Sequence, residues 1–271
     1  MIDWFIGLSH PIQAMIATLF TWSITAIGAG LVFCFKKMNK NVLDAMLGFA
    51  AGVMIAASFW SLLSPSIEMA TNLGMNAWLV AFIGLFGGGL LLFSGDRFFS
   101  RLEKRATKAS NNNTPKGNVK RCWMLIFSIT LHNIPEGLAV GVAFGSIAYG
   151  IEGATLTSAC MLALGIGLQN FPEGTAVSVP LRREGFSRRK SFFYGQLSGV
   201  VEPIAGVIGA LIALQARMLL PFLLAFAAGA MIYVVVAELI PESQTNEKKD
   251  IMALFTLVGF SIMMILDVAL G

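Results

Sequence analysis

The sequence predicts an all-α polytopic membrane protein with eight transmembrane helices in a single domain covering residues 1–271. Hydrophobic residues make up 56% of the chain and charged residues only 13%, a balance that excludes a soluble globular fold of this length. The apolar runs are long, continuous and rich in Leu, Ala, Gly and Met, whereas a transmembrane barrel would show short alternating strands. Basic residues gather in alternate connections between these runs, as expected of a chain threaded through a bilayer.

Each apolar run is long enough to cross the hydrocarbon core, which requires about 20 mainly apolar residues in a helix. In chain order, the eight predicted spans lie near residues 11–35, 43–64, 76–98, 120–146, 154–181, 190–214, 217–241 and 250–270.

The connections between the spans predict the topology. Eighteen of the 19 basic residues fall within 36–40, 97–121, 182–190 and 248–249, and only Arg217 falls in a connection of the other set. Because Lys and Arg are retained on the cytoplasmic side of short loops, we expect both termini to lie outside, on the periplasmic side of a bacterial membrane. The net charge of +4 follows from these loops and indicates contact with lipid headgroups, not with nucleic acid.

The longest connection, at about 99–119, separates the third and fourth spans. It contains basic residues and the polar run Asn111–Gly117 but no histidine. This composition predicts a solvated cytoplasmic linker.

Two hexapeptides in the fourth and fifth spans repeat one pattern. His132–Gly137 reads HNIPEG and Gln169–Gly174 reads QNFPEG, 37 residues further along. Between residues 131–142 and 168–179, eight of twelve positions are identical. The repeat is therefore interpreted as a duplicated element of one binding site.

Four glutamates lie inside the predicted spans: Glu136, Glu173, Glu202 and Glu238. A charged residue at the centre of a membrane helix costs about 2.5–3.5 kcal/mol on insertion scales. Lys and Arg occur only near the ends of the spans, so they offer these carboxylates no partners. The glutamates therefore require protons or a bound cation.

The spacing of the polar residues favours a metal ion. His132 and Glu136 are four residues apart and share a helix face, and Asn133 is offset by about 100°. The second motif repeats this arrangement with Gln169, Asn170 and Glu173.

Pro135 and Pro172 leave carbonyl groups unpaired near these residues, because proline lacks the N–H that would donate to the carbonyl group four residues earlier. Glu202, followed by Pro203, is the third contributor, from the sixth span. Glycines at 137, 141 and 145 allow the helices to approach closely.

Imidazole, amide and carboxylate ligands suit Zn²⁺, Fe²⁺, Mn²⁺, Co²⁺ and Cd²⁺ better than Cu(I). Glu136 and Glu173 could bridge two such ions, so we expect two bound ions where the fourth, fifth and sixth helices converge. Binding should release protons, since the ligands coordinate in their deprotonated forms.

HNxPEG, QNxPEG and the Glu-Pro pair of the sixth span resemble the ZIP (Zrt/Irt-like) family of divalent metal transporters, in its GufA-like branch. The resemblance covers the whole chain. It implies a ZIP-type bundle of eight helices, a binuclear site, and metal movement into the cytoplasm by an elevator-like shift of the ligand-bearing helices.

By motif position, the resemblance implies that His132, Glu136, Gln169 and Glu173 form a primary site. It implies a second site formed by Asn133, Glu136, Asn170, Glu173 and Glu202. Met54 resembles a position near the primary site, and Glu238 resembles a carboxylate on the exit route. Ordinary helix packing remains the alternative for Met54, and a helix-end position for Glu238.

Three other interpretations stay open at this level. A kinked helix with a protonated Glu would explain one motif but not two motifs and Glu202. A proton-coupled carrier or a channel for another cation would also use buried carboxylates. An intramembrane metalloenzyme would need a buried His and carboxylates, but the chain has no HExxH and only His132 within the spans, so we expect no enzyme. The resemblance favours a bacterial inner membrane and leaves a homodimer open.

Overall fold

The computed structural model describes residues 2–34, 39–109, 117–150 and 154–270. Within these ranges the backbone alone is described for residues 2–3, 96, 99–100, 102–109, 117–125, 127–129, 131–132 and 270.

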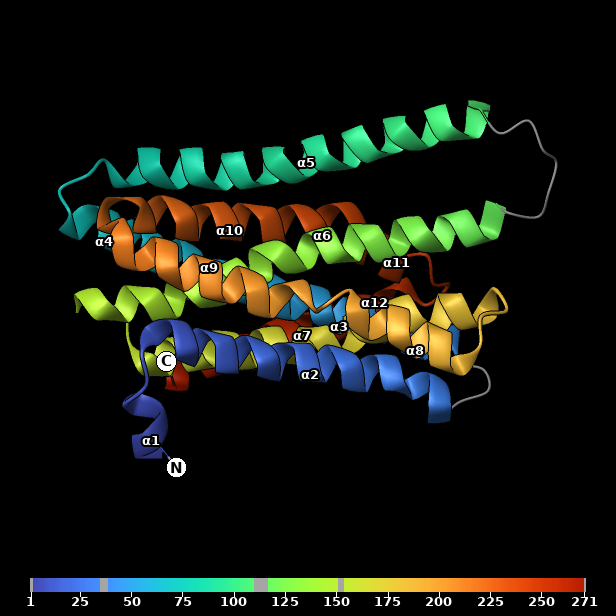
Figure 1. Ribbon diagram of the computed structural model, residues 1–271, viewed down its shortest axis with the longest axis horizontal. Helices are drawn as coiled ribbons and strands as arrows, with labels where there is room; N and C mark the ends of the chain where they lie inside the picture. Colours follow the sequence, from blue (N-terminus) through green and yellow to red (C-terminus); the bar gives the residue numbers. More distant parts are fainter. Residues whose placement is uncertain (1, 35–38, 110–116, 151–153, 271) are drawn as a thin grey trace.

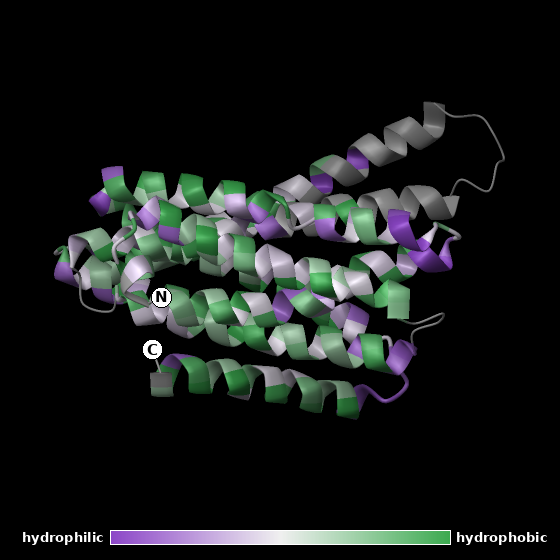
Figure 2. Ribbon diagram, turned by 60° about the horizontal axis from the view of Figure 1, so that its bottom comes forward, coloured by the Kyte–Doolittle hydropathy of each residue, from purple (hydrophilic) through white to green (hydrophobic). Residues whose placement is uncertain are grey.

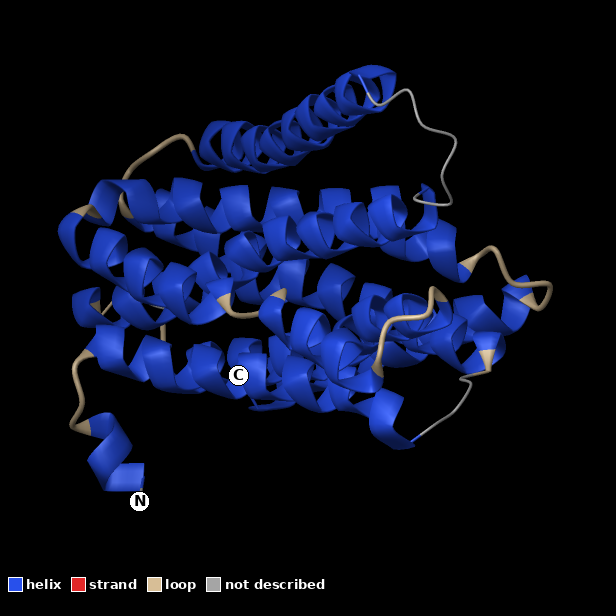
Figure 3. Ribbon diagram, turned by 45° about the vertical axis from the view of Figure 1, so that its right-hand side comes forward, coloured by secondary structure: helices blue, strands red, loops and turns tan. Residues whose placement is uncertain are grey.

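The described chain is a bundle of helices joined by short loops and contains no strand (Figures 1 and 3), which confirms the all-α prediction. In chain order, the α-helices are α1 (Ile2–Ile6), α2 (His10–Cys34), α3 (Lys40–Ala57), α4 (Ser64–Asn72), α5 (Ala77–Ala109), α6 (Gly117–Ser146), α7 (Leu156–Arg183), α8 (Arg188–Leu197), α9 (Val201–Gln215), α10 (Leu220–Val234), α11 (Ile240–Ser243) and α12 (Lys249–Ile265). Short 3₁₀ turns occur at η2 (Ile147–Tyr149) and η3 (Arg217–Leu219), and π turns at η1 (Ser58–Leu63), η4 (Val235–Leu239) and η5 (Leu266–Leu270).

Helix starts follow from local sequence. The Asn39 side chain accepts a hydrogen bond from the Asn41 N–H at 2.9 Å and caps α3. Thr155 and Ser158 form a reciprocal capping box at the start of α7, and Ser187 caps α8. These caps mark where the chain leaves the connections and enters its apolar runs.

Among the described residues, six stretches have the length and apolar composition needed to cross a membrane. They match six of the eight predicted spans and are His10–Cys34, Lys40–Asn72, Ala77–Gly95, Arg188–Gln215, Arg217–Ser243 and Lys249–Ala269. Figure 2 shows hydrophobic residues along the length of the bundle and hydrophilic residues gathered toward its ends.

The other two predicted spans fall on α6 and α7, which are not among the six. They contain 30 and 28 residues, and each carries the polar residues of one motif. The segment predicted as a linker is partly helical, because α5 continues to Ala109 and α6 begins at Gly117. The middle of that predicted linker, 110–116, lies outside the described residues.

Glycines join the long helices in four close pairs. A Cβ atom at Gly174 of α7 would overlap the Thr25 carbonyl of α2, and one at Gly141 of α6 would overlap the Gly206 carbonyl of α9. Glycines of α3 and α12, and of α5 and α10, approach each other's backbones in the same way. The same four pairs have the most extensive helix contacts in the described chain.

These pairs form two groups. The first comprises α2, α6, α7, α8 and α9, and the second comprises α3, α4, α5, α10 and α12. The main contacts between the groups are α3 on α7 and α10 on α6.

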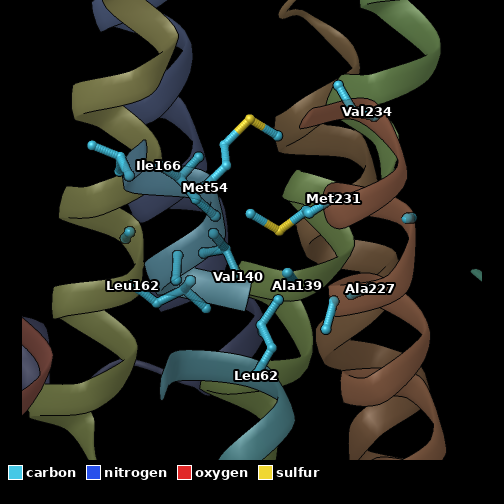
Figure 4. Packing of buried hydrophobic residues seen from close by; sticks show 14 of the residues in the cluster. Met54, Leu62, Ala139, Val140, Leu162, Ile166, Ala227, Met231 and Val234 are labelled. Carbon is cyan, nitrogen blue, oxygen red and sulfur yellow. The ribbon is translucent and has the colours of Figure 1, made fainter. Parts of the chain in front are cut away.

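Aliphatic and methionine side chains fill the space between the two groups (Figure 4). Met54 of α3 lies near Ile166 of α7, and Met231 of α10 lies on the side facing Val140 of α6. All four side chains are buried. The glycine-to-backbone contacts described above lie within the groups and not across this interface.

Candidate metal centre

The two motif helices lie within the first group and contact each other as well as α2. Both continue as helix through Pro135 and Pro172. The interruption in this part of the bundle lies instead in the third contributing segment, where a turn at 198–200 separates α8 from α9. Glu202 follows within the first turn of α9.

Asn133 connects the first motif to this interruption. Its amide Nδ2 donates a hydrogen bond to the Ser198 carbonyl at 2.8 Å, and its side chain is fully buried. A carbonyl at the end of α8 is left without an intrahelical partner, so Asn133 supplies the missing donor. The asparagine of the first motif therefore holds the broken helix that carries Glu202.

The two motifs are joined directly by a side-chain hydrogen bond. Gln169 Nε2 of α7 donates to Glu136 Oε1 of α6 at 2.7 Å. Both side chains have no solvent exposure. This contact holds the Glu136 carboxyl group between the two helices.

Glu202 receives donors from two other helices. Asn170 Nδ2 lies 2.9 Å from each of its carboxylate oxygens. The Thr21 hydroxyl of α2 donates to Glu202 Oε2. These contacts bring α2, α7 and α9 together around one carboxylate that is 1% exposed.

Five buried oxygen atoms in this cluster have no hydrogen-bond donor. One belongs to each of five predicted ligands: Asn133 Oδ1, Glu136 Oε2, Gln169 Oε1, Asn170 Oδ1 and Glu173 Oε2. An unpaired buried acceptor costs about 1–3 kcal/mol. Two further atoms of this kind occur in the described side chains, Ser191 Oγ and Asp267 Oδ2. The unpaired acceptors of the described side chains therefore concentrate at the motifs.

The three motif carboxylates are close enough for their charges to interact. Glu136 lies within electrostatic range of both Glu173 and Glu202. Glu173 is 6% exposed and also interacts electrostatically with Glu238. Mutual repulsion of buried carboxylates is relieved when a divalent cation binds between them.

Among the described side chains, His, Cys, Asp and Glu do not come together in threes in an arrangement that could hold a metal ion. Two of the three motif carboxylates face amide donors instead, as given above. The side chain of His132 lies outside the described part of the chain. The oxygen atoms of the motif residues are thus gathered in one region but are not arranged around a common centre.

The remaining two predicted residues, Met54 and Glu238, belong to the second helix group. Met54 is completely buried in the apolar layer between the groups. Glu238 is half-buried in the π turn η4. π turns inside α-helices frequently occur at functional sites.

Sequence reasoning missed Thr21. It lies in the first predicted span, among apolar residues, and forms with Thr18 and Thr25 a row of fully buried threonines on one face of α2. That row at helical spacing was the available signal, but a threonine in a membrane helix most often bonds its own backbone.

Comparison with known proteins decides the family. The profile of the family described as "ZIP Zinc transporter" matches residues 9–122 and 117–267. The chain belongs to the ZIP family. The predicted resemblance, including the GufA-like branch, is thereby confirmed.

Full-length ZIP relatives are similar to this chain from end to end. Zinc transporter ZIP11 of Homo sapiens is 40% identical over 98% of this chain and 99% of its own length. Zinc transporter ZIPB of Bordetella bronchiseptica is 36% identical over 97% and 82%, and zinc transporter GufA of Myxococcus xanthus is 33% identical over 95% and 98%. These ZIP proteins are named as transporters and not as enzymes. Family membership and the six apolar stretches together make this chain an integral membrane protein.

Proposed function

We propose that this ZIP protein transports Zn²⁺ across the membrane into the cytoplasm, using the motif residues of α6, α7 and α9 as its binding site. The observation that carries the proposal is the set of five unpaired buried oxygens, one on each of five motif residues. The names of the relatives support Zn²⁺ as the cargo. They also favour a transporter over an intramembrane metalloenzyme.

Two ions are proposed to share this site. The primary site consists of His132, Glu136, Gln169 and Glu173. The second site consists of Asn133, Glu136, Asn170, Glu173 and Glu202, so that Glu136 and Glu173 bridge the ions. Carboxylate, amide and imidazole groups are suitable ligands for Zn²⁺ and for Fe²⁺, Mn²⁺, Co²⁺ and Cd²⁺.

The amide groups of Gln169 and Asn170 hydrogen-bond to the carboxyl groups of Glu136 and Glu202. Each donates through its nitrogen to a glutamate and leaves its own oxygen unpaired. Turning either amide about its last torsion would present the oxygen in place of the nitrogen. We propose that Zn²⁺ binding reverses both amides and displaces protons from the glutamates, since coordinating carboxylates are deprotonated.

The proposed topology has eight spans, with α6 and α7 as the fourth and fifth. Their 30 and 28 residues exceed the length that a crossing requires. The basic connections lie in the cytoplasm and both termini lie outside, in a bacterial inner membrane. The polar residues of α6 and α7 are tolerated because they are buried among neighbouring helices.

Transport is proposed to proceed by an elevator-like shift of the first helix group against the second. Within each group, glycine contacts bring backbones together and lock the helices as pairs. The buried layer between the groups in Figure 4 consists of aliphatic and methionine side chains, and such surfaces slide with little loss of specific bonding. Met54 lies in this interface and Glu238 lies near Glu173, so we retain both as residues along the route.

Uptake of Zn²⁺ into proteoliposomes that contain a zinc-sensitive dye tests the proposal. Wild-type protein should give saturable uptake, and Glu136→Ala/Glu173→Ala should reduce uptake at least about a hundredfold by removing both bridging ligands. Glu184→Ala removes an exposed glutamate just after α7 and is the matched control. Repeating the assay with Fe²⁺, Mn²⁺ and Cd²⁺ ranks selectivity.

Two outcomes would overturn the proposal. Wild-type uptake by the correctly folded double variant would exclude these residues as the site. Uptake that fails to saturate would contradict a carrier and favour a channel.

A further inference from the structure

An apolar groove of about 800 Å³ lies between the two helix groups on the side of the bundle formed by α2, α3, α7 and α12. Its walls are almost entirely hydrocarbon. Phe20 of α2 and Phe255 of α12 are 43% and 41% exposed, so the groove opens sideways. In a protein that spans a bilayer, this opening faces lipid.

One end of the groove is polar and basic. Asn41 and Lys248 line it where α3 and α12 begin, and from there the lining reaches Phe20 and Leu164 in the middle of α2 and α7. The acidic neighbours Glu247 and Asp250 are exposed and do not belong to the lining. The groove therefore has a cationic mouth and a long hydrocarbon interior.

Hydrogen bonds hold this mouth in place. Asn246 Nδ2 donates to Asp44 Oδ2 at 2.7 Å and to Asn41 Oδ1 at 2.9 Å. Asn246 Oδ1 accepts from the Lys248 backbone N–H at 2.9 Å. Asp44 is 1% exposed and Asn246 3%, so the loop that presents Lys248 is anchored on α3.

We infer that this groove binds one anionic phospholipid, with an acyl chain along the apolar walls and the headgroup phosphate at Lys248. Charge complementarity favours a lipid over a second copy of the chain, because Lys248 at the mouth of the apolar groove can pair with an anionic headgroup. A lipid bound there touches Leu168, Phe171 and Pro172, which lie on the same turns of α7 as the motif residues. It would also wedge between the two helix groups.

Native mass spectrometry of the purified full chain, titrated with equal amounts of phosphatidylglycerol and phosphatidylcholine, tests this inference. Wild-type protein should retain one phosphatidylglycerol with about fivefold preference, which is the usual effect of one lysine near an anionic headgroup. Lys248→Gln should abolish the preference, and Lys190→Gln, the same change at an exposed lysine outside the groove, should keep it.

A groove-filling variant tests the apolar part separately. Val42 lines the groove and is 49% exposed, so Val42→Trp should exclude both lipids without disturbing the buried core. Val236→Trp, at an exposed valine outside the lining, is the control. Unchanged lipid retention in Lys248→Gln and Val42→Trp would overturn the inference. So would conversion of a dimer to a monomer by Val42→Trp, which would identify the occupant as a second copy of the chain.

Discussion

At the scale of single residues, Glu202 shows how a membrane protein holds a carboxylate without a basic partner. Asn170 and Thr21 together direct donors at both of its oxygens. These donors set the direction in which the carboxyl group points. Thr21 is therefore a positioning residue for the proposed second ion.

Replacing Thr21 tests this role. Thr21→Val keeps the shape of the side chain but removes the hydroxyl donor, and a hydrogen bond to a charged group is worth enough to raise the KM for Zn²⁺ uptake about tenfold. Thr21→Ser keeps the donor and should transport like the wild type. Uptake into dye-loaded proteoliposomes gives the KM of each variant. Equal KM values for Thr21→Val and Thr21→Ser would show that Thr21 is not a positioning residue.

The residues proposed as ligands could be identified from the sequence, because buried carboxylates are costly in a membrane and the motif is repeated. Glu136 and Glu173 stood out as buried charges within a duplicated motif. The direction of each amide was not predictable: Gln169 and Asn170 turn nitrogen, not oxygen, toward a glutamate. Side-chain orientation depends on neighbours from α2, α6 and α9, which lie far away in sequence.

At the scale of helices, backbone contact through glycine organises the bundle. Gly88 of α5 meets the Phe226 carbonyl of α10, and Gly229 of α10 meets the Leu85 carbonyl of α5. Small residues allow van der Waals contact along whole helices, which is the main source of helix association within a bilayer.

Two adjacent glycines of α5 allow a controlled test of close packing between α5 and α10. A Cβ at Gly88 would overlap the Phe226 backbone, whereas a Cβ at Gly87 would lie 3.6 Å from the Phe226 ring, an ordinary contact. Gly88→Ala should destabilise the protein by about 1–3 kcal/mol through overpacking, and Gly87→Ala should leave stability unchanged. Thermal unfolding in detergent measures the difference, and equal melting temperatures would argue against close α5–α10 packing.

Hydropathy predicted the positions of the helices closely, but it did not predict where the helices are interrupted. Pro135 and Pro172 suggested irregular backbone in α6 and α7, yet both helices continue through them. The break lies at 198–200, where the Asn133 side chain replaces a missing helical donor. Such a break depends on a partner from another helix and leaves little trace in the local sequence.

At the scale of the whole molecule, the unpaired oxygens and the apolar layer lie in different parts of the bundle. The proposed ligands lie inside the first helix group, whose members are joined by glycine contacts. The layer around Met54 and Met231 separates that group from the second (Figure 4). A site enclosed in one group can travel with it, which is the basis of the proposed elevator-like movement.

The central claim is that the motif oxygens bind the ions that are carried. Equilibrium binding of Zn²⁺ to purified protein without an affinity tag tests it most directly, comparing wild type with Glu136→Gln/Glu173→Gln. Wild-type protein should bind two Zn²⁺ ions per chain and the variant none, because both bridging carboxylates are lost while their size is kept. Two ions bound to a folded variant would contradict the claim.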